Sequence, residues 1–163
     1  LVVIAPATTW APKHWNKDHW KKVVQNLKDK CSIVFTGGPK DDELIKYIGG
    51  DEFLNLAGKT NVIELAEIFS RADVVLAPDS GSAHLAWATQ KPAVVTIFTC
   101  TPLKYLAPPG DENKYIAVTG NLPCQPCFKR KCRFKTSACT NLPSPEEIIN
   151  IVNKLLSNRI NRV

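Results

Sequence analysis

The chain has 163 residues, of which 44% are hydrophobic and 22% are charged. This composition excludes an intrinsically disordered chain, because such chains carry too few apolar side chains to form a core, and the length suits one ordinary domain. The formal net charge of +6 favours an anionic partner, such as a phosphate, a nucleic acid or an acidic membrane surface, without choosing among them.

Short apolar runs alternate along the chain with segments in which apolar residues recur at helical spacing. The apolar runs are continuous, which is typical of strands buried on both faces of a parallel sheet. Five strands are expected at residues 1–5, 32–36, 53–55, 74–77 and 93–98, and residues 115–118 are a candidate for one more short strand. The pattern predicts the α/β class, with a Rossmann-like parallel sheet that has helices on both faces.

Two helix faces lie between these strands. They are marked by Trp20, Val23, Val24 and Leu27 and by Val62, Leu65, Ala66 and Phe69, all of which we expect to contact the core. Asn61 and Glu64 predict a capping box at the start of the second helix. Ser144 before Pro145, with two glutamates after it, predicts a last helix over residues 145–156.

The chain reads as one domain over residues 1–163. No apolar stretch approaches the roughly 18 residues that span a bilayer, and no signal peptide is visible. The chain begins with Leu1 and enters a strand at once, from which we expect that an N-terminal half precedes it in the full-length protein.

A strand-loop-helix junction at residues 77–84 is the sharpest candidate for a binding site, because ligands of open α/β sheets bind at the carboxyl ends of the strands. Gly81 would let a ligand approach the backbone, and the free N–H groups at the start of the helix suit a diphosphate. Ser80 and Ser82 can donate further hydrogen bonds. The junction therefore predicts a diphosphate site.

Asp79 and His84 complete this junction. The charge of Asp79 would repel a phosphate, so a sugar hydroxyl is the better ligand for it. The structural alternative is that Asp79 only caps the helix and that His84 only packs on the face of that helix.

A second candidate follows the first strand. Thr8 and Thr9 offer neutral donors and Lys13 offers a point charge, the combination that holds a pyrophosphate as it becomes more negative on departure. An exposed loop lysine with no ligand is the structural alternative for Lys13.

A third candidate is the run of residues 36–43 after the second strand. Its glycines, Gly37 and Gly38, would let a nucleotide base or ribose approach, and an acid near Asp42 could accept a hydrogen bond from a ribose hydroxyl. A turn followed by an acidic first helical turn explains the same residues equally well.

The segment of about residues 120–143 reads as irregular and rich in cysteine and proline. Cys124, Cys127, Cys132 and Cys139 have the spacing C-x2-C-x4-C-x6-C. The first pair has the spacing of zinc ligands, whereas the remainder is tighter than in common zinc ribbons, so a structural zinc ion, disulfides and free thiols all stay open.

Five cations accompany these cysteines, with two aromatic residues among them: Lys129, Arg130, Lys131, Arg133 and Lys135, with Phe128 and Phe134. A small zinc-stapled module that binds nucleic acid is therefore one alternative function. We prefer contact with anionic lipid head groups or with phosphates of an acceptor, and do not expect a nucleic-acid partner.

The order of these motifs resembles that of glycosyltransferase family 9, which contains the ADP-heptose:lipopolysaccharide heptosyltransferases. The resemblance rests on the threonine pair followed by Lys13, the Gly37–Gly38 turn, residues 56–60, and Asp79 with Gly81 and His84. It spans residue 1 to about residue 156, and it is the ordered set of motifs that makes it specific.

The resemblance implies the C-terminal, donor-binding domain of a GT-B glycosyltransferase, with a separate N-terminal domain for the acceptor. It implies that Thr8, Thr9 and Lys13 contact the diphosphate and that Gly81 and His84 contact the phosphate and nucleotide. It further implies that Asp79 holds donor sugar hydroxyls and that an acid near Asp42 contacts the ribose.

The activity implied is inverting transfer of heptose from ADP-heptose, or a related nucleotide sugar, to a lipid A–Kdo acceptor of the lipopolysaccharide inner core. No cofactor is required, Lys13 stabilises the leaving group, and the catalytic base lies in the N-terminal domain. The implied location is the cytoplasm, with peripheral association on the inner face of the bacterial inner membrane. A related GT-B enzyme, such as a nucleotide-sugar epimerase, is the remaining enzyme alternative.

Overall fold

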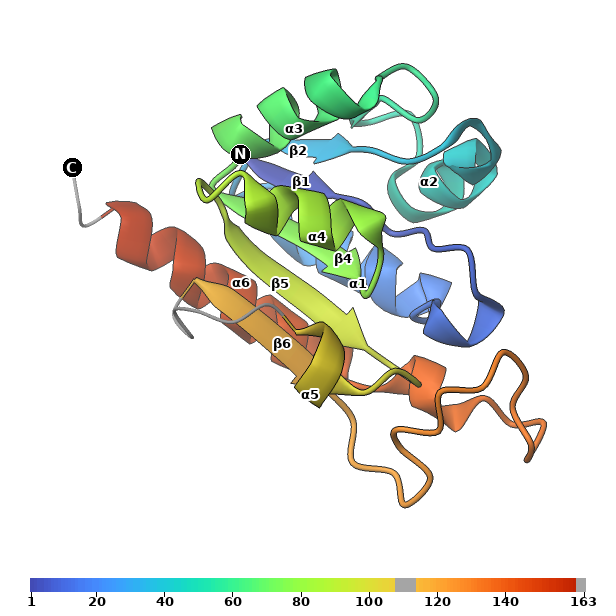
Figure 1. Cartoon of the computed structure of the whole chain (residues 1–163). Coiled ribbons are helices and arrows are strands. Elements are labelled where there is room, and N and C mark those ends of the chain that lie inside the picture. The colour runs from blue at the N-terminus through green and yellow to red at the C-terminus, as the bar shows by residue number, and fades with distance from the viewer. Residues whose placement is uncertain (108–113, 161–163) are drawn as a thin grey trace.

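The computed structural model of the chain describes residues 1–107 and 114–160. Its sheet has six parallel strands in the order β3-β2-β1-β4-β5-β6 (Figure 1). The strands are β1 (Val2–Ile4), β2 (Ile33–Phe35), β3 (Leu54–Asn55), β4 (Val74–Pro78), β5 (Ala93–Phe98) and β6 (Tyr115–Thr119). The five expected strands are confirmed, and the candidate at residues 115–118 is a sixth strand at the sheet edge, paired with β5.

Helices connect the strands and cover both faces of the sheet, as the sequence predicts (Figure 1). The α-helices are α1 (Lys17–Leu27), α2 (Asp42–Gly49), α3 (Val62–Arg71), α4 (Gly81–Ala88), α5 (Leu103–Leu106) and α6 (Pro145–Ile160). Short 3-10 turns are η1 (Ala11–Lys13), η2 (Pro39–Asp41) and η3 (Ala138–Asn141). None of the helices in the described ranges is long and apolar enough to span a bilayer.

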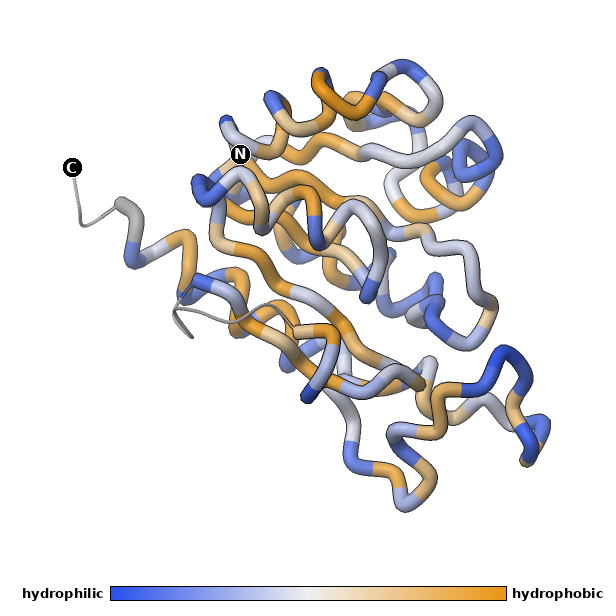
Figure 2. Tube along the Cα trace, viewed as in Figure 1, coloured by the Kyte–Doolittle hydropathy of each residue, from blue (hydrophilic) through white to orange (hydrophobic). Residues whose placement is uncertain are grey.

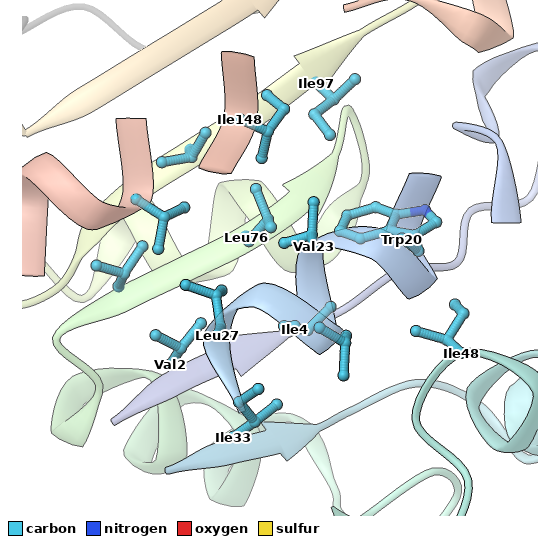
Figure 3. Packing of buried hydrophobic residues seen from close by; sticks show 14 of the residues in the cluster. Val2, Ile4, Trp20, Val23, Leu27, Ile33, Ile48, Leu76, Ile97 and Ile148 are labelled. Atoms are coloured by element: carbon cyan, nitrogen blue, oxygen red, sulfur yellow. The ribbon is translucent and has the colours of Figure 1, made fainter. Parts of the chain in front are cut away.

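Alternate residues of each strand divide the core into two layers. Val2 and Ile4 point to a layer formed with α1, α2 and α6, where Trp20 packs (Figure 3). Val3 points to the opposite layer, which α3 and α4 cover with residues such as Phe69. Because both faces of the sheet are buried there, β1, β4 and β5 are largely continuous apolar runs, which explains why these strands can be recognised in the sequence (Figure 2).

Two helix ends depart from the prediction. α6 begins at Pro145 as expected but continues to Ile160 instead of ending near residue 156, because no proline or glycine follows to stop it. Val62, expected in the core, is 68% exposed, because it is the first residue of α3 and lies at the open end of the sheet. The capping box of Asn61 and Glu64 is confirmed by reciprocal hydrogen bonds of 2.8–3.0 Å.

The segment 120–143 is irregular, as predicted, and lies at the carboxyl ends of the strands (orange in Figure 1). Several contacts attach it to the rest of the chain, among them three hydrogen bonds. The Trp15 Nε1 donates to the carbonyl of Pro143 (3.0 Å), the Asn16 amide donates to the carbonyl of Thr140 (2.8 Å), and Phe128 donates to Cys100 through the backbone.

Candidate functional site

The sheet order reverses between β1 and β4, which are adjacent parallel strands with Ile4 in register with Leu76. The chain turns to opposite sides after these two strands, so a crevice opens at their carboxyl ends. In doubly wound sheets this switch point is where ligands bind. The sequence placed its two strongest candidate loops after these same two strands.

A cleft of about 480 Å³ lies at this point. It is lined by the loop after β1, the turn after β2, the junction before α4, and α5. The lining residues are Ala7, Thr8, Thr9, Lys13, Gly38, Asp41, Asp79, Ser80, Gly81, Ser82, His84 and Leu106. Thr8, Thr9, Lys13 and the predicted residues of the junction 79–84 are all among them, whereas Asp42 is not, so the structure brings together loops that are about seventy positions apart in the chain.

An ion pair joins the two principal loops at the floor of this cleft. The Lys13 Nζ lies 2.7 Å from a carboxylate oxygen of Asp79, whose side chain is 3% exposed. The Nε2 of His84 lies 3.6 Å from the other carboxylate oxygen, and the His84 side chain is half exposed. Asp79 thus lies between a lysine from one wall of the cleft and a histidine from the other.

The start of α4 is open to an anion. Ser80 precedes the helix without making a side-chain capping bond, and its buried Oγ has no hydrogen-bond partner within the described chain. The first backbone bond of the helix comes from His84, so the amides of Gly81 and Ser82 precede it. A Cβ at Gly81 would meet nothing within 4 Å. Uncapped amides beside open space are the arrangement that binds phosphate at a helix N-terminus.

The loop after β1 is held in shape by its own side chains. The Nε2 of His14 lies 2.7 Å from the carbonyl oxygen of Thr8. The Lys13 Nζ lies 5.2 Å from the centre of the Trp10 ring, and the guanidinium of Arg130 lies 4.9 Å from the same ring. The aromatic ring therefore contacts both the cleft lysine and the cysteine-rich segment.

Asp42 does not line the cleft, contrary to the expectation for a ribose contact. Its carboxylate accepts hydrogen bonds from Asn55 (2.8 Å) and pairs with Lys46 (2.8 Å). The bond from Lys46 lowers the pKa of Asp42 below its usual value. Asp41, one residue earlier, lines the cleft instead, because the η2 turn shifts which acid faces the opening.

The run of residues 56–60, one of the motifs of the resemblance, has a structural role. Gly58 has a φ of +69°, and a Cβ there would lie 2.9 Å from Pro39. Its amide donates to the carbonyl of Gly37 (2.9 Å). This close approach fastens the turn after β2, and with it Asp41, at the rim of the cleft.

A smaller pocket of about 190 Å³ adjoins the cleft and shares Ala7, Gly38, Asp41 and Ser82 with it. Val62 supplies part of its apolar wall, and the buried Oγ1 of Thr36 has no hydrogen-bond partner in the described chain. Thr36 and Asp41 belong to the run of residues 36–43 that the sequence analysis proposed for the base or ribose, whereas Val62 was expected only in the core. The exposure of Val62 could have been predicted from its position. It directly follows the N-cap residue Asn61 and is therefore the first residue of the helix.

The cysteines are free thiols in the structure, so the disulfide alternative is not what it shows. Cys124, Cys127, Cys132 and Cys139 line one small cavity together with Cys100. No group of three or more histidine, cysteine or acidic side chains within residues 1–107 and 114–160 is arranged to hold a metal ion, so the zinc alternative finds no such site here.

The thiols of this cavity differ in acidity. Burial raises the pKa of Cys139 to about 11. Backbone hydrogen bonds, the strongest from Ser137, lower the pKa of Cys132 below its usual value. Cys132 is therefore the more readily ionised thiol of the two.

The chain is similar in sequence to a known family and to several curated proteins. The family model of glycosyltransferase family 9 (heptosyltransferase) matches residues 1–138. Lipooligosaccharide heptosyltransferase 2 of Campylobacter jejuni is 29% identical over 159 residues, covering 93% of this chain and 49% of the relative. The chain thus spans about half the length of the curated relatives it matches.

Solved structures show the same fold. The ADP-heptose lipopolysaccharide heptosyltransferase II of Escherichia coli superposes with a TM-score of 0.79 at 18% identity, covering 97% of this chain and 46% of that chain. The iron-containing dodecameric heptosyltransferase TibC of E. coli, in complex with ADP-D-β-D-heptose, gives a TM-score of 0.76 at 19% identity, covering 96% and 45%. These neighbours have the GT-B fold, and the chain covers slightly less than half of each. Together with the family match over most of its length, this shows that the chain belongs to glycosyltransferase family 9, the heptosyltransferases.

Proposed function

We propose that this chain is the donor-binding domain of a heptosyltransferase and that its cleft binds ADP-heptose or a related nucleotide sugar. The observation that carries the proposal is the pairing, across one cleft, of Lys13 with the uncapped start of α4. The names of the relatives and a neighbour solved with an ADP-heptose ligand support the choice of nucleotide and sugar.

The diphosphate would lie between the two loops at the switch point. Thr8, Thr9 and Lys13 contact it from one wall, and the amides of Gly81 and Ser82 contact it from the other. These groups lie around the same opening of the structure. A positive helix end and a lysine together stabilise the anionic diphosphate more than either does alone.

The nucleoside would extend into the adjoining pocket, whose apolar wall at Val62 suits a base. Asp41 takes the ribose role expected of Asp42, because it lines both the cleft and the pocket. Asp79 and His84 remain for the donor sugar: the carboxylate accepts from sugar hydroxyls, and the exposed imidazole approaches from the α4 side.

The reaction proposed for the full-length protein is an inverting transfer. A hydroxyl of the acceptor attacks the anomeric carbon, the bond from that carbon to the diphosphate oxygen breaks, and the hydroxyl proton passes to a base in a preceding domain. No metal ion takes part in this scheme. The negative charge that develops on the departing ADP is stabilised by Lys13 and by the start of α4, which are already in place before the reaction.

The acceptor proposed is a lipid A–Kdo saccharide of the lipopolysaccharide inner core, bound mainly by the preceding domain. This places the protein at the inner face of the bacterial inner membrane as a peripheral protein. The names of the relatives favour this assignment over a nucleotide-sugar epimerase and over a nucleic-acid-binding module.

Calorimetric titration of the chain with ADP, AMP, ADP-heptose and UDP tests the proposal. ADP and ADP-heptose should bind, and AMP should bind roughly tenfold or more weakly, because it lacks the phosphate that a charged donor would hold. Equal affinity for ADP and AMP would show that the second phosphate makes no contact.

Gly81→Val is the sharpest variant for this titration. A side chain at Gly81 enters open space, so the fold should be kept while the room for the phosphate is lost. His84→Ala should weaken binding of ADP-heptose more than binding of ADP, because the imidazole is assigned to the sugar side. Gly81→Val with wild-type affinity for ADP would rule out the α4 contact.

A further inference from the structure

A strongly basic surface lies next to the donor cleft. The eight residues from 128 to 135 contain five cations, and the sequence has no acidic residue from position 113 to position 145. None of these cations forms an ion pair with another residue of the described chain. So much uncompensated charge in one place favours a bound anion.

The charge is gathered around a pocket of about 420 Å³. Arg130, Lys131 and Lys135 line one side of it, and the other side is formed by residues around η1, among them His14 and Asn16. Lys13 of η1 lines the donor cleft, whereas Ala11 and Pro12 of the same turn line this pocket. The two pockets therefore share one wall.

The walls of this basic pocket are held by contacts between distant parts of the chain. The Asn16 backbone amide donates to the carbonyl of Thr140 (2.8 Å), and its side-chain amide donates to Asn141 (2.7 Å). Arg130 lies over Trp10, which also contacts Phe128 at 5.6 Å between ring centres. Both walls of the pocket are therefore fixed by contacts within the folded chain.

We propose that this basic pocket binds a phosphate monoester carried by the acceptor glycolipid, beside the donor. The proposal rests on the proposed function, because it takes the neighbouring cleft as the donor site. Three cations with hydroxyl and amide donors around one pocket suit a group with up to two charges and three free oxygens. Phe128 and Phe134 are 53% and 55% exposed, which suits a lipid-borne ligand at a membrane interface.

Vesicle binding by the whole chain tests this pocket. The probes are phosphatidylcholine vesicles that contain phosphatidic acid, a monoester, or phosphatidylglycerol, a diester, matched in surface charge. The test variant is Lys131→Gln with Lys135→Gln. The control is Lys22→Gln with Lys154→Gln, which removes the same charge from exposed lysines on α1 and α6.

The wild type and the control should bind phosphatidic acid vesicles equally, and the test variant should bind them roughly tenfold to thirtyfold more weakly. Glucose 6-phosphate serves as a soluble phosphate monoester. If it binds the wild type and not the test variant, the result supports the monoester pocket. Equal binding of the two anionic lipids, an equal loss in the control pair, or tighter binding of single-stranded DNA than of vesicles at the same salt would each overturn the proposal.

The vesicle experiment and the ADP titration can fail independently of each other. ADP affinity should be unchanged in the test variant, because neither lysine lines the donor cleft. If ADP fails to bind the wild type while phosphatidic acid vesicles bind it, the donor assignment fails and the anion pocket stands. Unchanged thermal unfolding of both double variants checks that the fold is kept.

Discussion

The ion pair between Lys13 and Asp79 stabilises the fold and prepares the cleft for its ligand, so its removal should have two separate effects. Lys13→Met keeps the apolar stem of the side chain and removes the charge. It leaves the carboxylate of Asp79 buried, at 3% exposure, without its partner at 2.7 Å. His84 remains 3.6 Å from the other carboxylate oxygen.

The magnitude follows from the burial of both partners. Breaking a buried ion pair by removing one partner costs about 3–5 kcal/mol, and we expect about 3 kcal/mol here because Lys13 keeps some contact with solvent. For a domain of this size, such a loss lowers the Tm by roughly 6–12 °C. Adding Asp79→Asn removes the unpaired charge, so the double variant should regain most of the loss.

Urea denaturation of the wild type, both single variants and the double variant gives the coupling energy. In the same set, Lys13→Met should weaken ADP binding roughly tenfold to a hundredfold, whereas Asp79→Asn should bind ADP at least as tightly as the wild type, since Lys13 is then free for the phosphate. If Lys13→Met is as stable as the wild type and binds ADP equally, the lysine has neither role.

Three further outcomes are expected. Burial lowers the pKa of His19 below 6.5, so the folded state resists its protonation and the free energy of unfolding should fall as the pH drops below about 6.5. His19→Gln should flatten this pH dependence. An unchanged slope in the variant would show that His19 does not cause it. Iodoacetamide should alkylate Cys132 before Cys139, because the pKa of Cys139 is raised to about 11; peptide mass spectrometry would show the reverse order if the acidities were wrong. Gly58→Ala should lower the free energy of unfolding, measured by denaturation, by at least about 1 kcal/mol and by more than Gly50→Ala does. Both glycines have a positive φ, but only a Cβ at Gly58 would clash with Pro39. Equal losses of stability in the two variants would exclude the clash.

The layered fold was predictable from the sequence because both faces of the sheet are buried. Continuous apolar runs mark β1, β4 and β5 directly, and helical spacing marks α1. β6 was harder to recognise because it lies at the edge, where its residues are only partly buried. The length of α6 was underestimated because the sequence there has no stop signal to fix the end.

The candidate site was predictable to the level of loops but not of single side chains. Parallel topology by itself brings the loops that hold Lys13 and Gly81 to one rim. It does not reveal that Lys13 pairs with Asp79, nor that Asp41 replaces Asp42 at the opening, because both depend on short 3-10 turns. The spacing of apolar residues does not predict the positions of such turns.

A crystal structure of the chain with bound ADP would locate the nucleotide. The terminal phosphate should lie between the Lys13 ammonium and the backbone amides of Gly81 and Ser82, with the adenosine directed toward Asp41 and Val62. Nucleotide density at any other place, such as the basic pocket of Arg130, with the cleft between β1 and β4 left empty, would contradict this placement.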